Sequence, residues 1–296
     1  MSSQFFGVWP ALLTPSTPDG GVGVSALREV TTYLLDKGVD GFYLCGSTGE
    51  GVFLTESERR LVAETVIDVV AKRVPVIVHV GAVGTREAVA LALHAQDVGA
   101  AGVASILPPF SRNVAEIYSH YEAIAAAVPE TPFLPYLFGG EVDALSLMQT
   151  LRERCPNLAG AKYTGSNMYE LQGILELQKG WSIFSGMDEQ CIFAAMVGAP
   201  GNIGTTLNFM PGVYKTMRAR YKAGDGIGAV DLQLRANRVT RVLHTFGAYG
   251  ALFEMMRMLG FECGEPRMPR ASLSSERRAA FHRALRQTGF SELAEM

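Results

Sequence analysis

Residues 75–107, PVIVHVGAVGTREAVALALHAQDVGAAGVASIL, contain the pattern that decides the fold. Two short apolar runs, 75–80 and 102–107, flank a segment of helical period at 86–98. A strand, a helix and a second strand in this order form the unit from which parallel sheets are built. The stretch therefore predicts a βαβ unit.

The same alternation continues on both sides of this unit. We expect eight strands, near residues 7–13, 41–45, 75–80, 102–107, 132–136, 158–162, 182–185 and 202–205. The helices expected between them are 25–37, 57–72, 86–98, 114–128, 143–154, 168–178 and 189–197. Thr55 and Glu58 have the spacing of a capping box before the second helix. Eight such units, without a dinucleotide fingerprint after the first strand, favour an α/β fold of the (β/α)8 TIM-barrel class over a doubly wound sheet.

The alternation stops after the eighth strand, and the remaining chain has helical period only. We expect helices near 213–222, 231–245, 251–259 and 274–287. The first is assigned as the eighth barrel helix. The predicted organisation is a barrel at 1–224 that carries the active site, followed by a C-terminal helical extension at 225–296 packed on the barrel.

Composition excludes several classes of function. The 296 residues are 48% hydrophobic and carry a formal net charge of -3, which gives no reason to expect nucleic acid or an anionic membrane as a partner. No apolar run approaches the about 18 residues of a membrane span, and the first apolar run is interrupted by Pro10, unlike an export signal. The four cysteines, which are widely spaced and form no CxxC motif, are Cys45, Cys155, Cys191 and Cys263. We therefore expect a reducing, cytoplasmic location.

Lys162 differs from the other lysines of the chain. Five of the six lysines lie on expected helices or at their ends, whereas Lys162 ends the apolar strand run LAGAK. Burial in such a strand is costly for an ammonium and lowers its pKa, which makes the amine a nucleophile toward ketones. The alternative is a structural lysine, ion-paired at the barrel rim.

Two residues on neighbouring strands are expected beside this amine. Tyr136 closes the fifth strand, and its phenol could reach Lys162 as a proton shuttle or merely pack at the barrel top. Strand alternation places Tyr163 toward the helices and Thr164 on the inward side with Lys162. Thr164 is therefore a candidate substrate contact.

Two loops at the same end of the barrel carry further candidates. Gly46-Ser47-Thr48-Gly49-Glu50 offers hydroxyls and exposed N–H groups that can hold a carboxylate, although a GxxG turn alone is weak evidence. Gly186-Met187-Asp188-Glu189 places two carboxylates at the barrel mouth, either to accept hydrogen bonds from substrate hydroxyls or to cap the next helix. The five histidines show no metal-ligand spacing, so we predict neither a metal site nor a cofactor.

Together these motifs resemble the dihydrodipicolinate synthase / N-acetylneuraminate lyase family over essentially the whole chain. The resemblance implies that the protein is a class I pyruvate lyase or aldolase, which acts on a 2-keto acid and releases pyruvate. It also implies a homotetramer, the common assembly of the family. It implies that Lys162 forms the imine, that Tyr136 relays the proton of the C4 hydroxyl, and that Ser47 and Thr48 hold the pyruvate carboxylate.

Within the family the chain is more similar to the N-acetylneuraminate lyase branch. Gly186, Asp188, Glu189 and Thr205 match positions that bind sugar hydroxyls there, and no arginine lies between Tyr136 and residue 152 to bind a second carboxylate. The expected activity is cleavage or formation of the C3–C4 bond of N-acetylneuraminate or a related 2-keto-3-deoxy sugar acid.

Two departures from the family pattern keep other functions open. The segment after Tyr136 lacks the usual proline and is two residues shorter, and Phe110 stands where many members carry a tyrosine that extends the proton relay to a neighbouring subunit. The alternatives are dihydrodipicolinate synthase, a Schiff-base dehydratase or decarboxylating hydrolase of a keto acid, and a non-catalytic keto-acid-binding homologue.

Overall fold

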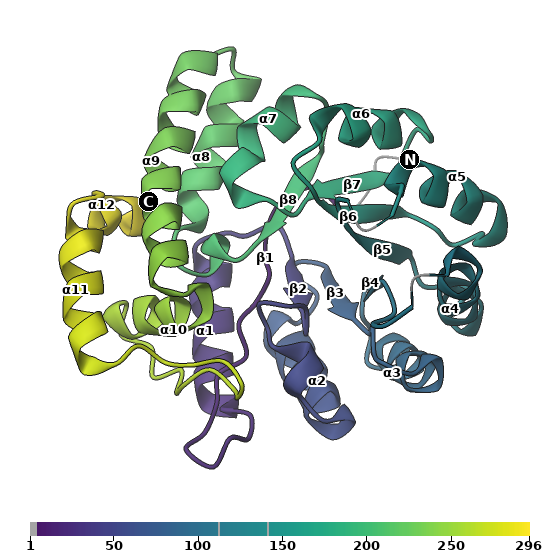
Figure 1. Cartoon of the computed structure of the whole chain (residues 1–296), viewed down its shortest axis with the longest axis horizontal. Helices are drawn as coiled ribbons and strands as arrows, with labels where there is room; N and C mark the ends of the chain where they lie inside the picture. The colour runs from purple at the N-terminus through teal and green to yellow at the C-terminus, as the bar shows by residue number, and fades with distance from the viewer. Residues whose placement is uncertain (1–4, 112, 141) are drawn as a thin grey trace.

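The computed structural model describes residues 5–111, 113–140 and 142–296, and its centre is a ring of parallel strands (Figure 1). The strands follow chain order around the ring, and β1 pairs with β8. A parallel bridge between Ala11 and Tyr43 closes the ring between β1 and β2. The predicted TIM barrel is confirmed. Its strands are β1 (Gly7–Pro10), β2 (Phe42–Leu44), β3 (Val76–His79), β4 (Gly102–Ile106), β5 (Phe133–Phe138), β6 (Gly160–Thr164), β7 (Ser182–Ser185) and β8 (Gly201–Gly204).

Helices alternate with the strands and cover the outside of the ring (Figure 1). The predicted capping box starts the second helix, because the Thr55 side chain accepts from Glu58 N–H while the Glu58 carboxylate accepts from Thr55 N–H. The barrel helices are α1 (Val24–Asp36), α2 (Glu56–Val70), α3 (Thr85–Asp97), α4 (Val114–Ala127), α5 (Ala144–Arg154), α6 (Met168–Glu176), α7 (Cys191–Met196) and α8 (Pro211–Lys222).

The strands are buried on both faces, so the molecule has two apolar layers. The outer layer lies between the strands and the helices and includes Tyr163 of β6. The inner layer fills the barrel with large side chains, among them Trp9, Tyr43 and Phe184. Phe5 packs edge-on against Trp9 in this inner layer. The barrel interior is therefore a packed core, and polar groups gather at the carboxyl ends of the strands.

The chain beyond α8 forms α9 (Gly226–Phe246), α10 (Ala248–Met258), α11 (Ser275–Arg286) and α12 (Phe290–Glu295). Figure 1 shows these helices on one side of the barrel, with α9 beside α8. The division of the chain at residue 224 stays a prediction. No helix in the described ranges has the length and apolar character needed to cross a bilayer.

Several of the expected boundaries were wrong, among them the end of β1, which is Pro10 rather than residue 13, and the start of α9, which is Gly226 rather than residue 231. β5 and β6 each continue two residues further, because Leu137 and Phe138 pair with Tyr163 and Thr164. Lys162 therefore lies inside its strand. α7 starts at Cys191, two residues later than expected, because Asp188–Gln190 form a separate 3-10 helix, η2. The short helix α12 was not expected.

Candidate active site

Lys162 points into the barrel from the middle of β6. It lies opposite Tyr136 of β5 and Phe184 of β7, and its side chain is only 4% exposed. Its neighbours Ala161 and Tyr163 belong to the outer apolar layer, which confirms the expected alternation. Lys162 forms no ion pair within the described part of the chain, which contradicts its interpretation as an ion-paired rim lysine.

Two aromatic rings contact the Lys162 amine instead of a carboxylate. Nζ lies 4.1 Å from the ring centroid of Tyr136 and 4.8 Å from that of Tyr43. The electron-rich faces of such rings stabilise an ammonium. Tyr136 is thus beside Lys162 as expected, whereas the sequence interpretation missed Tyr43, which has no signal beyond an aromatic residue on an apolar strand.

Thr164 and Gly186 complete the surroundings of the amine. A Cβ at Gly186 would lie 1.9 Å from Thr164 Oγ1 and 3.0 Å from Lys162 Cε, so only glycine fits at this position. Thr164 Oγ1 is buried and has no hydrogen-bond partner among the described residues. This hydroxyl is free to bind a ligand near the amine.

Asp188 lies in the 3-10 helix η2, which we call the acidic turn, at the carboxyl end of β7. Its Oδ2 accepts from the backbone N–H and the hydroxyl of Thr206, both at 2.8 Å, so Asp188 does not cap α7. Tyr214 of α8 lies 2.8 Å from the same threonine hydroxyl and can donate to it. The helix-cap interpretation of Asp188 was therefore wrong.

The second carboxylate oxygen of Asp188 is buried without a partner among the described residues. It faces Gly204, where a Cβ would lie 1.5 Å from Oδ1. Burial raises the pKa of Asp188 to about 6, while the Thr206 hydrogen bonds oppose the rise, Glu189 adds to it and Lys162 opposes it. Oδ1 is therefore the Asp188 atom that is available to accept a hydrogen bond from a ligand.

Glu189 follows in the acidic turn and is more exposed. Its side chain is 35% exposed, and its Oε1 lies 3.3 Å from Nε2 of His244 in α9. The two carboxylates thus have different surroundings, one buried and bound to Thr206 and the other partly exposed beside His244.

The loop at residues 46–50, which we call the hydroxyl loop, follows β2 and contacts the residue after β8. Thr48 Oγ1 lies 2.8 Å from Thr205 Oγ1. Gly46 packs on Tyr43, since a Cβ there would lie 2.7 Å from Tyr43 Cε1. Tyr43 therefore connects the hydroxyl loop to the Lys162 amine.

Glu50 anchors this loop and was not predicted to do so. Its carboxylate is fully buried, and it accepts from the backbone N–H and the guanidinium of Arg267 and from the guanidinium of Arg270. Arg270 also donates to Ser47 O at 3.0 Å and lies over the Tyr249 ring, 3.2 Å from its centroid. The C-terminal extension therefore holds the hydroxyl loop in place.

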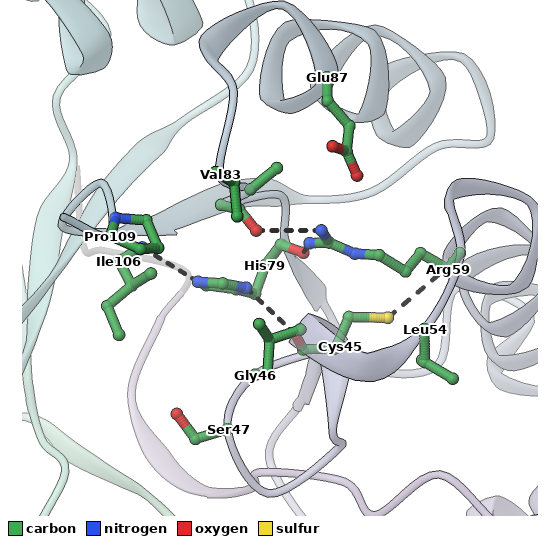
Figure 2. A pocket seen from close by; sticks show the side chains of 14 residues that line it. Cys45, Gly46, Ser47, Leu54, Arg59, His79, Val83, Glu87, Ile106 and Pro109 are labelled. Atoms are coloured by element: carbon green, nitrogen blue, oxygen red, sulfur yellow. Dashed lines mark hydrogen bonds between the residues drawn. The ribbon is translucent and has the colours of Figure 1, made fainter. Parts of the chain in front are cut away.

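A cavity of about 300 Å³ lies beside the hydroxyl loop and shares Gly46 and Ser47 with it (Figure 2). His79 and Arg59 supply its buried polar groups. Nε2 of His79 accepts from Ile106 N–H, so the ring proton is on Nδ1, which faces Cys45 O at 3.1 Å. Burial, with Arg59 and Lys162 nearby, holds the pKa of His79 well below its usual value. His79 is thus a neutral structural histidine.

The two departures from the family pattern lie at the rim. Phe110 is 93% exposed and has a positive φ of 69°, so its ring does not reach the amine of its own chain. After β5, Gly139 passes so close to Gly165 that a Cβ would lie 2.7 Å from that residue's Cα. The short segment after Tyr136 is therefore packed against the end of β6.

Lys162 and Tyr136 lie within β6 and β5, and the other predicted site residues lie at or just beyond the carboxyl ends of strands, where barrel enzymes place their chemistry. No group of three His, Cys, Asp or Glu side chains suited to a metal ion is found in residues 5–111, 113–140 and 142–296. A buried amine with no counter-ion among the described residues, next to a phenol and hydroxyl-bearing loops, defines a class I lyase or aldolase, an enzyme that binds a keto substrate through an imine.

The chain belongs to the dihydrodipicolinate synthetase family, whose model matches residues 4–288. It is 31% identical over 282 residues to the N-acetylneuraminate lyase of Rhizobium meliloti (strain 1021), with 94% of each chain covered. It is also 31% identical over 295 residues to the 4-hydroxy-tetrahydrodipicolinate synthase of Methanopyrus kandleri, with 98% of each chain covered.

The fold is similar to that of Proteus mirabilis N-acetylneuraminate lyase, with a TM-score of 0.92 and 28% identity. The match covers 97% of this chain and 99% of that one. The resemblance expected from the motifs is thus confirmed, including the similarity to the N-acetylneuraminate lyase branch.

Proposed function

We propose that the protein cleaves N-acetylneuraminate or a related 2-keto-3-deoxy sugar acid between C3 and C4 and releases pyruvate. The observation that carries this proposal is the contact with Tyr136 of the buried Lys162 amine, which has no ion-pair partner in the described ranges. The similarity to N-acetylneuraminate lyases and the absence of an arginine between Tyr136 and residue 152 favour the sugar acid over an aldehyde partner that carries a second carboxylate.

In the proposed reaction the Lys162 amine attacks the C2 carbonyl and water leaves, which gives an iminium. Tyr136 takes the proton of the C4 hydroxyl as the C3–C4 bond breaks. The bond's electron pair moves into the iminium, so the products are an aldehyde and an enamine. Protonation at C3 and hydrolysis of the imine then release pyruvate and the free amine.

The substrate's ends are assigned to the loops on either side of the amine. Ser47 and Thr48 hold the carboxylate, and Thr164, Gly186, Asp188, Glu189 and Thr205 surround the hydroxylated end. The buried, unpartnered Thr164 Oγ1 and Asp188 Oδ1 support this assignment, because buried polar atoms without partners are uncommon in folded proteins.

Borohydride reduction in the presence of pyruvate tests the imine. We expect a pyruvate-derived mass on the peptide that contains Lys162, and none in Lys162→Arg. An adduct on another lysine, or no adduct, would contradict the proposal. A lactate-dehydrogenase-coupled screen of 2-keto-3-deoxy sugar acids then identifies the substrate.

A second candidate is 4-hydroxy-tetrahydrodipicolinate synthesis from pyruvate and aspartate semialdehyde, which the similarity to the Methanopyrus kandleri enzyme supports. Condensation of these two compounds without sugar-acid cleavage would favour it. Loss of water without pyruvate release would instead indicate a dehydratase, and an adduct without any turnover would indicate a binding protein.

We also propose a homotetramer in the cytoplasm. The exposed apolar side chains of Val52, Val83 and Phe110 support an assembly, and four cysteines that are buried and unpaired fit a reducing compartment. Sedimentation analysis and cell fractionation test the two statements. A monomer at micromolar concentration, or an exported protein, would contradict them.

A further inference from the structure

Helix α9 of the C-terminal extension carries a stripe of polar side chains that contacts the acidic turn. The stripe consists of Gln233, Asn237 and His244. Their spacings of 4 and 7 residues place them on one face of the helix. Gln233 is fully buried, although it lies on a face that otherwise packs apolar residues such as Leu232 and Ala236.

Gln233 and Asn237 bind the main chain of the acidic turn and of the start of α7. Gln233 Nε2 donates to Asp188 O at 3.0 Å, and its Oε1 accepts from Ile192 N–H at 2.9 Å. Gln233 Nε2 also donates to Asn237 Oδ1, and Asn237 Nδ2 donates to Glu189 O at 3.1 Å. The carbonyl groups of both acidic residues are thus bound by one face of α9.

The third member of the stripe contacts a side chain. His244 Nε2 lies 3.3 Å from Glu189 Oε1, while the Asp188 carboxylate is held separately by Thr206. The turn has only three residues, so these contacts determine where both carboxylates point. A helix outside the ring of βα units therefore controls groups at the barrel mouth.

We propose that Gln233, Asn237 and His244 are positioning residues that determine which distal group of the substrate the site accepts. This inference rests on the proposed function, because it assigns the acidic turn to the hydroxylated end of a sugar acid. The stripe contacts neither Lys162 nor Tyr136, so imine formation with pyruvate does not depend on it.

The test compares full-length variants on two substrates. N-acetylneuraminate carries distal hydroxyls, whereas 4-hydroxy-2-oxopentanoate has the same reacting atoms without them. For Gln233→Leu we expect kcat/KM for N-acetylneuraminate, divided by kcat/KM for the short substrate, to fall about tenfold, mainly through KM. The reason is that Asp188 O of the turn and Ile192 N–H of α7 lose their partner. The rate of borohydride trapping with pyruvate stays within about twofold, because the amine is untouched.

Two further variants keep the test decisive. His244→Leu changes a side chain that is 58% exposed, so it folds even if Gln233→Leu does not, and it should shift the ratio in the same direction. Thr240→Val is the matched control: Thr240 is buried on the same helix, but its hydroxyl donates only to Ala236 O within α9. This variant should leave the ratio unchanged.

An unchanged ratio in both stripe variants would overturn the inference, and so would equal loss on both substrates together with slower trapping. If the wild-type protein forms the pyruvate adduct but cleaves no hydroxylated acid, the proposed function itself fails. The wild-type assay therefore tests the function, and the ratio between variants tests the stripe.

Discussion

Thr48 Oγ1 and Thr205 Oγ1 lie 2.8 Å apart and share a hydrogen bond between the loop after β2 and the residue after β8. We assign Thr48 to the carboxylate end of the substrate and Thr205 to its hydroxylated end. This one bond therefore joins the two ends of the proposed site.

A double-mutant cycle measures this coupling. We expect Thr48→Val and Thr205→Val each to weaken pyruvate binding, with a coupling energy of about 1 kcal/mol, because either change removes the same hydrogen bond. The pyruvate dependence of borohydride trapping is the measurement. Thr205→Ser keeps the hydroxyl and serves as the control, and fully additive effects would show that the bond is unimportant in solution.

Tyr136→Phe separates proton transfer from imine formation. The ring that contacts the Lys162 amine at 4.1 Å remains in the variant, so trapping with pyruvate should change little. The loss of the phenol should lower kcat for C–C cleavage by about 10²–10⁴, the usual contribution of a general acid–base group. If kcat is retained, another group relays the proton.

Asp188 makes stability depend on pH. Its folded-state pKa of about 6 lies above the ordinary value of 3.8, so folding favours the protonated form. This contribution to stability is fully present below about pH 3.8 and is lost as the pH rises through 6. The side chain of the Asp188→Asn variant is never charged. The free energy of unfolding of this variant, minus that of the wild type, should therefore rise by up to about 3 kcal/mol between pH 4 and pH 7. Urea unfolding across this range is the measurement, and a difference that falls with pH contradicts the assignment.

Arg267→Met tests the anchor of the hydroxyl loop. Arg267 and Glu50 are 7% and 0% exposed, so the variant leaves a buried carboxylate with Arg270 as its remaining cation. We expect a loss of about 3 kcal/mol in the free energy of unfolding. Arg154→Met is the control, because the Arg154–Glu122 pair is exposed and should contribute far less. Equal effects of the two variants would contradict a special role for the buried pair.

The sequence predicted the barrel because each βα unit carries its own periodic pattern. Strand ends were predicted less well, because Phe138 and Thr164 belong to β5 and β6 but precede glycines that resemble loop residues. The six residues of α12 are too few to show a helical period, so that helix was missed.

Site residues could be predicted where a reactive side chain stands on an apolar strand, because both signals then belong to one residue. Lys162 and Tyr136 are unusual for an apolar strand, and their register brings them together. For Asp188 the sequence left a helix cap and a substrate contact as alternatives, because its partner Thr206 follows the next strand and becomes a neighbour only when β7 pairs with β8. The pairing of Glu50 with Arg267 spans 217 residues, and no local pattern predicts it.

That long-range pairing has a consequence for how the protein is made. The hydroxyl loop is synthesised long before the cations that neutralise its buried Glu50, since Arg267 follows Glu50 by 217 residues. A nascent barrel without residues 267 and 270 would bury an uncompensated carboxylate next to Ser47 and Thr48. The loop proposed to bind the carboxylate is therefore completed only when residues 267 and 270 dock, and we expect a chain terminated before them to bind keto acids poorly.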